Sequence, residues 1–377
     1  MAVALLFGNV AMIYRPFGKT GKLVSAIGFG GMRFENIDNE DACVAMLVRA
    51  AECGINYFDT APKYFGVRSE ERFGAGLREL RRQGLPYYVS SKTFESSERG
   101  IRKEIEQQLR RLDVERIDFY HAWCITDLDL WRQRKANGLI EAFRKLKDEG
   151  LIGHICVSSH LIGDEIRELL DEGVFEGVLF GYSAYNFRTR EAAFDAIRRH
   201  SIGCVVMNPL GGGIIPQNPD LFDFLGAGPD RTVVQAALQF VVAHEDVSVT
   251  LVGFGEIEQI DEAVAAVAAL PLPAQTEIER IKRSSAASFD GICTGCGYCV
   301  DDCPENIRIP QLMDAYNQLI LRGEQKQVIN RLKYHWEVPL EEAERCTECR
   351  CCETACTQHL PIVQRLEEIV AMAHARA

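Results

Sequence analysis

Two cysteine runs with identical spacing constrain this chain more than any other feature of its sequence. Nine of the fourteen cysteines lie between Cys293 and Cys356, in two runs that both read C-x2-C-x2-C-x3-C. Clustering of this density indicates metal binding rather than a framework of disulfides. Because thiolates that hold a metal must stay reduced, the sequence predicts a reducing compartment, which we take to be the cytoplasm.

The spacing of each run is that of bacterial ferredoxins, in which three cysteines wrap one face of an iron-sulfur cube and the fourth ligates the other cube. The sequence therefore predicts two [4Fe-4S] clusters, one held by Cys293, Cys296, Cys299 and Cys356 and the other by Cys303, Cys346, Cys349 and Cys352. Cys351 is surplus to both sets. A pair of zinc sites is the alternative, since C-x2-C also suits tetrahedral Zn(II), but two complete runs plus Pro304 favour iron-sulfur clusters. The second run has Thr357 in place of that proline, which we expect to affect the turn more than the ligation.

Ahead of the cysteines, eight short apolar runs alternate with amphipathic helical patterns. The strand candidates are Ala26–Gly30, Asn56–Phe58, Tyr88–Ser91, Ile117–Trp123, Ile152–Ser158, Gly177–Ser183, Gly203–Met207 and Val247–Val252. Alternating βα units with strands buried on both faces predict a parallel sheet, and eight such units predict closure into a (β/α)8 TIM barrel. An open doubly wound sheet is the alternative.

The domain organisation follows from these two patterns. We expect an N-terminal extension over residues 1–11, because the sequence from Met12 already looks like the beginning of the folded chain. Residues 12–285 are predicted to form the barrel, whose last helix stops before Pro271. Residues 286–377 are predicted to form a small, mainly helical ferredoxin-like domain, with helices between its two cysteine runs.

Composition excludes several classes of protein. Hydrophobic residues make up 47% and charged residues 25% of the chain, as in ordinary globular proteins, so disorder is excluded. The formal charge of -12 and the absence of a long basic stretch predict no nucleic-acid partner. No apolar run is long enough for a membrane span. We expect a small-molecule substrate, together with a redox partner protein at the iron-sulfur domain.

Three reactive side chains follow neighbouring barrel strands. Asp59 and Tyr64 come at the end of the second strand candidate, and Lys92 ends the third. Active sites of such barrels lie at the carboxyl ends of the strands, so these side chains are expected to converge. Asp59 can balance the charge of a buried Lys92, and a cationic lysine lowers the pKa of a neighbouring phenol. Tyr64 then becomes a general acid for hydride addition to a carbonyl.

These residues carry a resemblance to a known family. The segments GINYFDTAPKY, VSSK, VSSH and YRPFGKTGKLVSAIGFGGM resemble the aldo-keto reductases over roughly residues 12–270. The cysteine-rich tail resembles the branch of that family with a fused ferredoxin-type domain. The resemblance implies a catalytic tetrad of Asp, Tyr, Lys and His around NAD(P)H at the barrel mouth. Asp59, Tyr64 and Lys92 match three of its members directly.

The fourth member of the tetrad does not match directly. The family's fourth strand usually reads Asp-x-Tyr-x-x-His, whereas this chain has Trp123 at the histidine position and His121 two residues earlier. Positions two apart on a strand share a face, so His121 is expected to face the barrel interior one layer deeper. Trp123 is then expected to shape the substrate pocket. The alternative is that His121 is a core histidine.

The resemblance also implies where the nicotinamide cofactor binds. The expected contacts are Ser158, Tyr182, Met207, Asn208, Leu210, Gly212, Gly253 and Gln259. The sequence near the eighth strand carries Glu256 and Glu258 and no lysine or arginine that could bind a 2′-phosphate. NADH is therefore slightly favoured over NADPH.

Two classes of function remain open from the sequence. The first is a nicotinamide-dependent oxidoreductase that transfers hydride to or from a carbonyl or alcohol, with clusters that serve electron transfer or structure. Clusters move one electron at a time and hydride moves two, so the coupling of the two chemistries is not explained. The second is a ferredoxin-like electron carrier or docking protein on a barrel with altered or lost reductase activity. One-electron reduction of a bound substrate is a further alternative.

Overall fold

A computed structural model gives the fold of the chain and describes residues 3–7, 10–161, 163–268, 271–285, 291–293 and 295–374. The chain divides into two compact units, Met1–Leu210 with Phe222–Ser284, and Gly211–Leu221 with Ser285–Ala377. This division differs from the predicted domains in two respects. The segment Gly211–Leu221 groups with the cysteine-rich unit, and the amino-terminal residues group with the barrel. Residues 286–290, where the second domain was predicted to start, lie outside the described residues.

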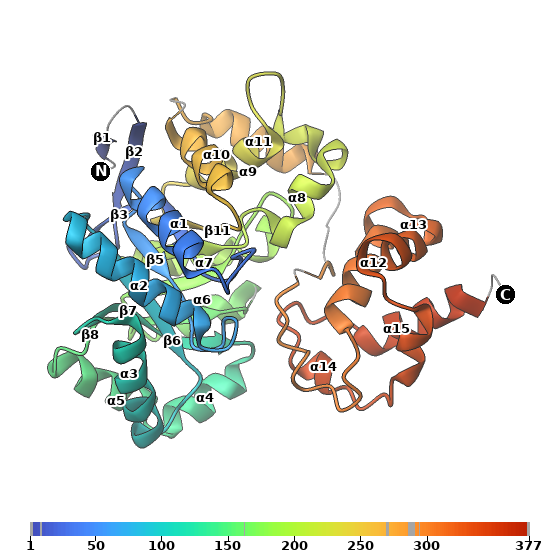
Figure 1. Cartoon of the computed structure of the whole chain (residues 1–377), viewed down its shortest axis with the longest axis horizontal. Helices are drawn as coiled ribbons and strands as arrows, with labels where there is room; N and C mark the ends of the chain where they lie inside the picture. Colours follow the sequence, from blue (N-terminus) through green and yellow to red (C-terminus); the bar gives the residue numbers. More distant parts are fainter. Residues whose placement is uncertain are drawn as a thin grey trace. The chain divides into compact units, whose positions relative to one another are not determined.

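Eight parallel strands close into a barrel in the first unit, which confirms the predicted (β/α)8 fold (Figure 1). The strands are β4 (Ile27–Gly30), β5 (Tyr57–Asp59), β6 (Tyr88–Thr93), β7 (Ile117–Ile125), β8 (Ile152–Ser159), β9 (Gly177–Gly181), β10 (Gly203–Met207) and β11 (Val249–Gly253). They lie in sequence order around the ring, and β11 pairs with β4 to complete it. Each strand candidate corresponds to one of them.

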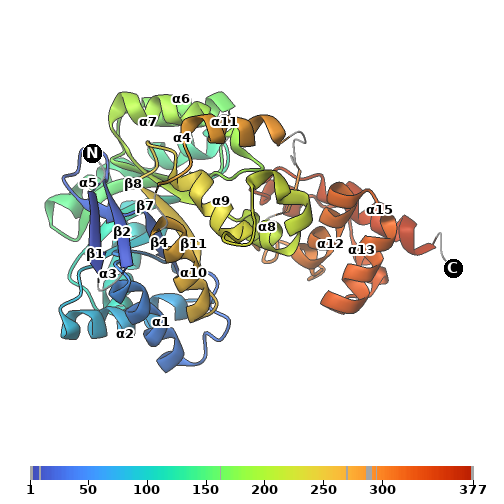
Figure 2. The same cartoon turned by 90° about the horizontal axis from the view of Figure 1, so that it is seen from above.

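Helices cover the outside of the strand ring (Figure 2). They are α1 (Glu40–Glu52), α2 (Arg68–Gln83), α3 (Glu98–Leu112), α4 (Leu128–Ala136), α5 (Leu139–Asp148), α6 (Gly163–Asp171), α7 (Ala192–His200), α9 (Val233–Val242), α10 (Ile257–Ala268) and α11 (Gln275–Ser284). Helix α3 is typical: Ser97 caps its amino end, and Ile101, Ile105 and Leu112 are fully buried on one stripe.

An aromatic cluster fills the amino-terminal end of the barrel. Phe17 packs against Tyr57 and Phe119, with ring centroids 6.1 and 4.2 Å away. A Cβ atom at Gly203 would lie 2.2 Å from the Phe17 ring, so this position at the start of β10 requires a glycine. This cluster closes the interior of the barrel at its amino end, and active sites of this fold lie at the carboxyl end.

An antiparallel sheet precedes the barrel. It consists of β1 (Val3–Phe7), β2 (Val10–Pro16) and β3 (Leu23–Ser25), in that order. Strand β1 belongs to the predicted amino-terminal extension, and its pairing with β2 runs from Val3 opposite Tyr14 to Phe7 opposite Val10. Residues 1, 2, 8 and 9 of that extension lie outside the described residues.

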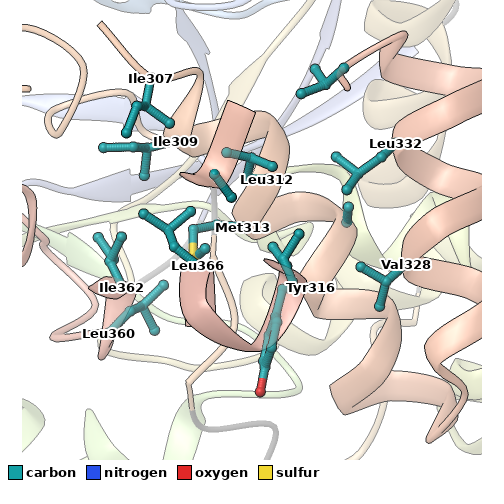
Figure 3. Packing of buried hydrophobic residues seen from close by; sticks show 14 of the residues in the cluster. Ile307, Ile309, Leu312, Met313, Tyr316, Val328, Leu332, Leu360, Ile362 and Leu366 are labelled. Carbon is teal, nitrogen blue, oxygen red and sulfur yellow. The ribbon is translucent and has the colours of Figure 1, made fainter. Parts of the chain in front are cut away.

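The second unit is helical, as predicted. Its elements after residue 285 are α12 (Ile309–Arg322), α13 (Gln325–Arg331), a π-helical turn η4 (Leu332–Trp336), the 3-10 helix η5 (Leu340–Arg345), α14 (Cys351–Thr354) and α15 (Ile362–His374). Figure 3 shows its core, in which Leu312, Met313 and Leu366 lie together. Cys299, Cys352 and Cys356 belong to the same core.

The segment Gly211–Leu221 is tied to this core unit by side-chain bonds. It contains η2 (Gly211–Gly213) and α8 (Ile214–Gln217). Arg322 of α12 donates to Asn218 at 3.0 Å and forms an ion pair with Asp220, and Arg331 of α13 donates to Gln217 at 2.6 Å. Of the helices in the described residues, none is both long and apolar enough to cross a membrane.

Candidate functional site

A buried ion pair lies at the carboxyl ends of two adjacent barrel strands. Lys92 Nζ of β6 lies 2.6 Å from Asp59 Oδ2 of β5, and each residue is 1% exposed. Lys92 also donates to the backbone oxygen of Thr60 at 2.9 Å, and Ser90 donates to Asp59 Oδ1 at 2.7 Å. These bonds satisfy both charges, which burial without partners would make costly.

Tyr64 lies beside this pair. The Lys92 ammonium is 5.2 Å from the centroid of the Tyr64 ring, and the tyrosine is partly exposed. Burial lowers the pKa of Lys92, and the neighbouring Asp59 opposes that shift. The structure therefore brings together the three side chains predicted to converge.

A second layer of polar groups, from helices α2 and α3, contacts the strand that carries Lys92. Gln108 of α3 donates to the Lys92 backbone oxygen at 2.8 Å and accepts from the hydroxyl of Tyr120. Glu70 of α2 is fully buried and accepts from Ser91 at 2.8 Å, while Arg111 pairs with it at 2.5 Å. Burial raises the pKa of Glu70 and Arg111 lowers it. Sequence reasoning missed this layer, because its bonded partners are far apart in the chain. Ser91 and Arg111 are 21 and 41 residues from Glu70. Tyr120 and Lys92 are 12 and 16 residues from Gln108.

His121 shares the face of Lys92. The two residues are partners in the β6–β7 register, and side chains in register on parallel strands point to the same side. His121 is fully buried, and in the described residues neither ring nitrogen has a partner at good hydrogen-bond geometry, while the backbone of Val157 is close enough to raise its pKa. Burial and the charge of Lys92 lower the pKa of His121 to about 3, so its ring is neutral at pH 7.

Trp123 forms an aromatic wall next to Tyr64. Its ring lies edge-on to Tyr64 at 5.7 Å and stacks on Phe94 at 4.1 Å. Phe94 follows β6 directly, and sequence reasoning missed it. The residue after each of three expected site residues has a positive φ: Phe65 after Tyr64, Cys124 after Trp123 and Asn208 after Met207. Such strain in non-glycine residues concentrates at functional sites.

The expected cofactor contacts are only partly brought to the barrel mouth. Ser158 is buried near the end of β8, and Met207 ends β10 and packs on the interior cluster. Asn208 and Leu210 follow Met207 and are partly exposed. Gly212 belongs to the second unit.

Tyr182 is the one expected contact that packs elsewhere. Its ring stacks on Phe240 of α9 at 5.9 Å and meets Phe194 of α7 edge-on at 5.2 Å. It therefore faces the covering helices rather than the mouth, which corrects its expected role. The reason is the strand alternation: Gly181 is in register with Met207, so the next side chain points to the other face.

An arginine lies near the end of the eighth strand, contrary to the sequence-based expectation. A Cβ atom at Gly253 would lie 2.5 Å from Cγ of Arg33, whose loop follows β4. Gln259 of α10 accepts from the backbone of Gly255 at 2.9 Å. A hydrogen bond with Glu35 raises the pKa of Glu256. Arg33 could have been found from the barrel prediction itself, because closure makes the first and eighth strands neighbours.

The two predicted cysteine sets correspond to two separate groups of thiols. Cys303, Cys346, Cys349 and Cys352 line one cavity together with Pro304 and Arg350. In the other group, burial raises the pKa of Cys299, and the charges of Cys296, Cys293 and Cys356 raise it further. Cys351 is exposed and is not among the residues that line the cavity. Each group holds the cysteines of one predicted set, and their ligation of a cluster stays a prediction.

Donors and one buried cation surround these thiols. Backbone N–H groups of Gly295, Glu348 and Leu360 donate to the sulfurs of Cys293, Cys346 and Cys356, each at 3.4 Å. Thr357 is fully buried, with its hydroxyl 3.4 Å from the sulfur of Cys296. Arg365 is 7% exposed, its Nη1 has no hydrogen-bond partner in the described residues, and its charge acts on Cys356. N–H donors and a buried cation suit an anionic cluster.

Across the described ranges, no group of three or more His, Cys, Asp or Glu side chains is placed to hold one metal ion. This finding bears equally on zinc and on iron-sulfur ligation.

A cavity of about 1040 Å³ lies at the opposite end of the barrel from Lys92. Its lining includes Tyr88 at the start of β6 and Asp118 near the start of β7. Active sites of this fold lie at the carboxyl ends of the strands, so we assign the chemistry to the mouth that holds Lys92.

Comparison with known proteins identifies both parts of the chain. The profile of the Aldo/keto reductase family matches residues 26–286, and the profile of a 4Fe-4S dicluster domain matches residues 292–361. The L-galactose dehydrogenase of Arabidopsis thaliana is 30% identical over 285 residues, which cover 68% of this chain and 88% of the relative. The NADH-specific methylglyoxal reductase of Escherichia coli K12 is 25% identical, with 53% and 68% covered.

Solved structures agree with this result. An aldo-keto reductase from Bacillus halodurans in its holo form superposes with a TM-score of 0.63 at 28% identity, covering 73% of this chain and 96% of that one. An aldo-keto reductase from Klebsiella pneumoniae in complex with NADPH gives a TM-score of 0.60 at 23% identity, with 71% and 93% covered. The second likeness concerns the fold alone.

Proposed function

Because this chain belongs to the aldo-keto reductase family and carries a C-terminal 4Fe-4S dicluster domain, we propose that it interconverts a carbonyl and an alcohol with Tyr64 as the acid-base group. The observation that carries the proposal is the buried Lys92–Asp59 pair beside the Tyr64 ring. A bound nicotinamide supplies or accepts the hydride. The residues of this chain hold the substrate oxygen and move its proton.

The proton is transferred at the Tyr64 hydroxyl. In the reductive direction Tyr64 donates to the alkoxide oxygen that forms as hydride reaches the carbonyl carbon. The Lys92 ammonium, 5.2 Å from the ring, stabilises the negative charge that the phenol acquires. Asp59 and the Thr60 backbone oxygen fix the position of that ammonium, so no reorganisation is needed during the reaction.

His121 is proposed to complete the tetrad from its unusual position. Its ring is buried and neutral, and it lies in register with Lys92. A neutral imidazole can donate one hydrogen bond to a carbonyl oxygen without adding a second positive charge beside Lys92. Trp123 is proposed to form the wall of the substrate pocket.

NADH remains the proposed cofactor, although the structure places one arginine near the eighth strand, where the sequence predicted none. Glu35 lies against Gly255 and raises the pKa of Glu256, and the negative charge of these acidic residues disfavours a 2′-phosphate. Arg33 acts in the opposite direction. The proposed contacts at the mouth are Ser158, Met207, Asn208 and Leu210, with Gly253 and Gln259 at the eighth strand. A relative described as NADH-specific supports the preference.

The two cysteine groups are proposed to hold [4Fe-4S] clusters that exchange single electrons with a redox partner protein. The N–H donors to their sulfurs and the buried Arg365 suit clusters of negative charge. Such clusters need a reducing compartment, for which we propose the cytoplasm.

Anaerobically purified protein is expected to contain about eight iron and eight labile sulfide per chain. Replacing Cys351 with Ser should leave that content unchanged, whereas Cys349→Ser should lower it. Zinc without labile sulfide would contradict the assignment of iron-sulfur clusters. Loss of iron in the Cys351 variant would show that the predicted set of cysteine ligands is wrong.

Substitution of Tyr64 tests the reductase function. Tyr64→Phe should abolish turnover of carbonyl substrates and leave nicotinamide affinity nearly intact, because it removes an interaction made mainly in the transition state. His121→Ala should lower turnover at least about a hundredfold if His121 orients the substrate oxygen. If the His121 variant loses stability but keeps its turnover, His121 is a core histidine and not a member of the tetrad. Full activity of Tyr64→Phe would favour the second candidate, an electron carrier on a barrel without reductase activity, which the displaced histidine also suggests.

A further inference from the structure

A buried arginine without a counter-ion lies at the aromatic wall. Arg134 of α4 is 8% exposed, and its Nη1 donates to the backbone oxygen of Trp123. Within the described residues, no carboxylate lies within salt-bridge distance of its guanidinium. Burial lowers the pKa of Arg134, and the charges of Cys124 and Asp127 oppose this shift. A buried charge in this state gains much from a bound anion.

A second cation lies over the same aromatic ring. Lys63 precedes Tyr64 and is exposed, and its Nζ is 4.9 Å from the centroid of Phe94. The guanidinium carbon of Arg134 is 5.6 Å from that centroid. Lys63 also has no carboxylate partner in the part of the chain that the structure describes. Two cations without ion pairs therefore share Phe94.

This pair of cations is connected to the reacting group by aromatic contacts. Phe94 stacks on Trp123 at 4.1 Å, and Trp123 meets the Tyr64 ring at 5.7 Å. Tyr64 and Phe94 are both partly exposed on either side of the buried Trp123, so a substrate whose carbonyl oxygen is at Tyr64 would extend toward Phe94. A group at its far end would reach the cations.

We propose that Lys63 and Arg134 form a subsite for an anionic group, and that the substrates of this chain are carbonyl compounds with a carboxylate or phosphate at the far end. The proposal rests on the proposed reductase function for the carbonyl end. A guanidinium binds two oxygens of a carboxylate or phosphate at once, and the lysine adds a mobile charge. The partly exposed ring of Phe94 would hold the apolar part between the two ends.

Steady-state kinetics of the holoenzyme with matched substrates tests the subsite. The carboxylate pair is 4-carboxybenzaldehyde and its neutral isostere 4-formylbenzamide, and the phosphate pair is glyceraldehyde 3-phosphate and glyceraldehyde. We expect kcat/KM to be at least about tenfold higher for the charged member of one pair, mainly through KM, because the anion is bound equally in ground and transition states. The pair that shows the preference identifies the anion.

Charge reversal at Lys63 sharpens the test. Lys63→Glu should reduce the charged-to-neutral ratio of kcat/KM to about one or below, and Arg134→Lys should retain more of it than Arg134→Gln. The matched control is Lys22→Glu, since Lys22 also lies over an aromatic ring, Tyr88 at 5.5 Å, near the amino end of β6. The control should keep the wild-type ratio.

Three outcomes overturn the proposal: equal kcat/KM within both pairs, an unchanged ratio in Lys63→Glu, or an equal change in the Lys22 control. Failure of the reductase function is distinguishable, because neither member of either pair would then be turned over. In that case calorimetric binding of terephthalate against terephthalamide decides the subsite alone. Equal affinity for the two would overturn it, and a preference for terephthalate that Lys63→Glu removes would support it.

Discussion

At the scale of single residues, the buried pair of Asp59 and Lys92 joins the carboxyl ends of β5 and β6. Each charge lies in the barrel interior and is stable there only with the other. The sequence was sufficient to predict this pair, because both residues end strands that the hydrophobic pattern locates. It could not predict that Phe94 and Arg134 meet, because this contact depends on how α4 packs against the segment that follows β6.

Lys92→Met should destabilise the protein by about 3 to 5 kcal/mol, because it leaves Asp59 as a buried charge without its partner. Denaturant unfolding followed by fluorescence measures this loss. The control is Lys135→Met, which removes a partly exposed ion pair with Glu172 at 2.7 Å and should cost less than about 1 kcal/mol. Equal losses in the two variants would mean that Asp59 is stabilised without Lys92.

Arg365 is expected to make the two clusters unequal. Arg365 is 7% exposed, and its charge lowers the pKa of Cys356 in the first cysteine set. A fixed positive charge favours the reduced, more negative form of a cluster, so Arg365→Gln should lower one of the two reduction potentials and Arg365→Lys should largely restore it. Redox titration monitored by electron paramagnetic resonance measures both potentials. An equal change in both, or in neither, would contradict this expectation.

At the scale of elements, the barrel was predictable because its strands are short, apolar and regularly spaced, and each is followed by an amphipathic helix. The hydrophobic pattern of the sequence could not predict how closely neighbouring helices pack against each other. Helix α2 passes close to the end of α3 at Gly74, where a Cβ atom would lie 2.1 Å from the backbone oxygen of Arg111. A backbone atom cannot move aside as a flexible side chain can.

Gly74→Ala is therefore expected to destabilise the protein by about 1 to 3 kcal/mol, although alanine is the better helix former. The sign of the change in the free energy of unfolding distinguishes steric overlap from helix propensity, because helix propensity alone would stabilise the alanine variant. Gly228→Ala is the control, because no atom lies within 4 Å of its Cβ position. Thermal unfolding of both variants gives the answer, and a stabilised Gly74 variant would show that α2 can shift away from α3.

At the scale of the whole molecule, the second unit depends on its cysteines more than the barrel does. Its two cysteine runs are about fifty residues apart in sequence, and three of the thiols belong to its hydrophobic core. Clusters that draw ligands from both runs would fix the core, so metal binding and folding of this unit are coupled. The barrel has an aromatic core of its own.

Removal of iron should therefore unfold the second unit and leave the barrel folded. Trp336 reports on the second unit, whereas Trp123 and Trp131 are 1% exposed in the barrel. After chelation, the emission of Trp336 should shift to longer wavelength, and the Trp336→Phe variant should show no shift. A shift in that variant would mean that the barrel needs the clusters to fold.

The segment Gly211–Leu221 has a consequence for how such a protein can arise by gene fusion. The chain enters the second unit after Leu210, returns to the barrel at Phe222 and leaves it again after Ser284. Joining a cluster module to the end of an ancestral barrel gene would provide only the last of these crossings. The segment Gly211–Leu221 would also have to fit α12 and α13, to which it is bonded through Arg322 and Arg331. Exchange of the tail between relatives should therefore succeed only when this inner segment is exchanged with it.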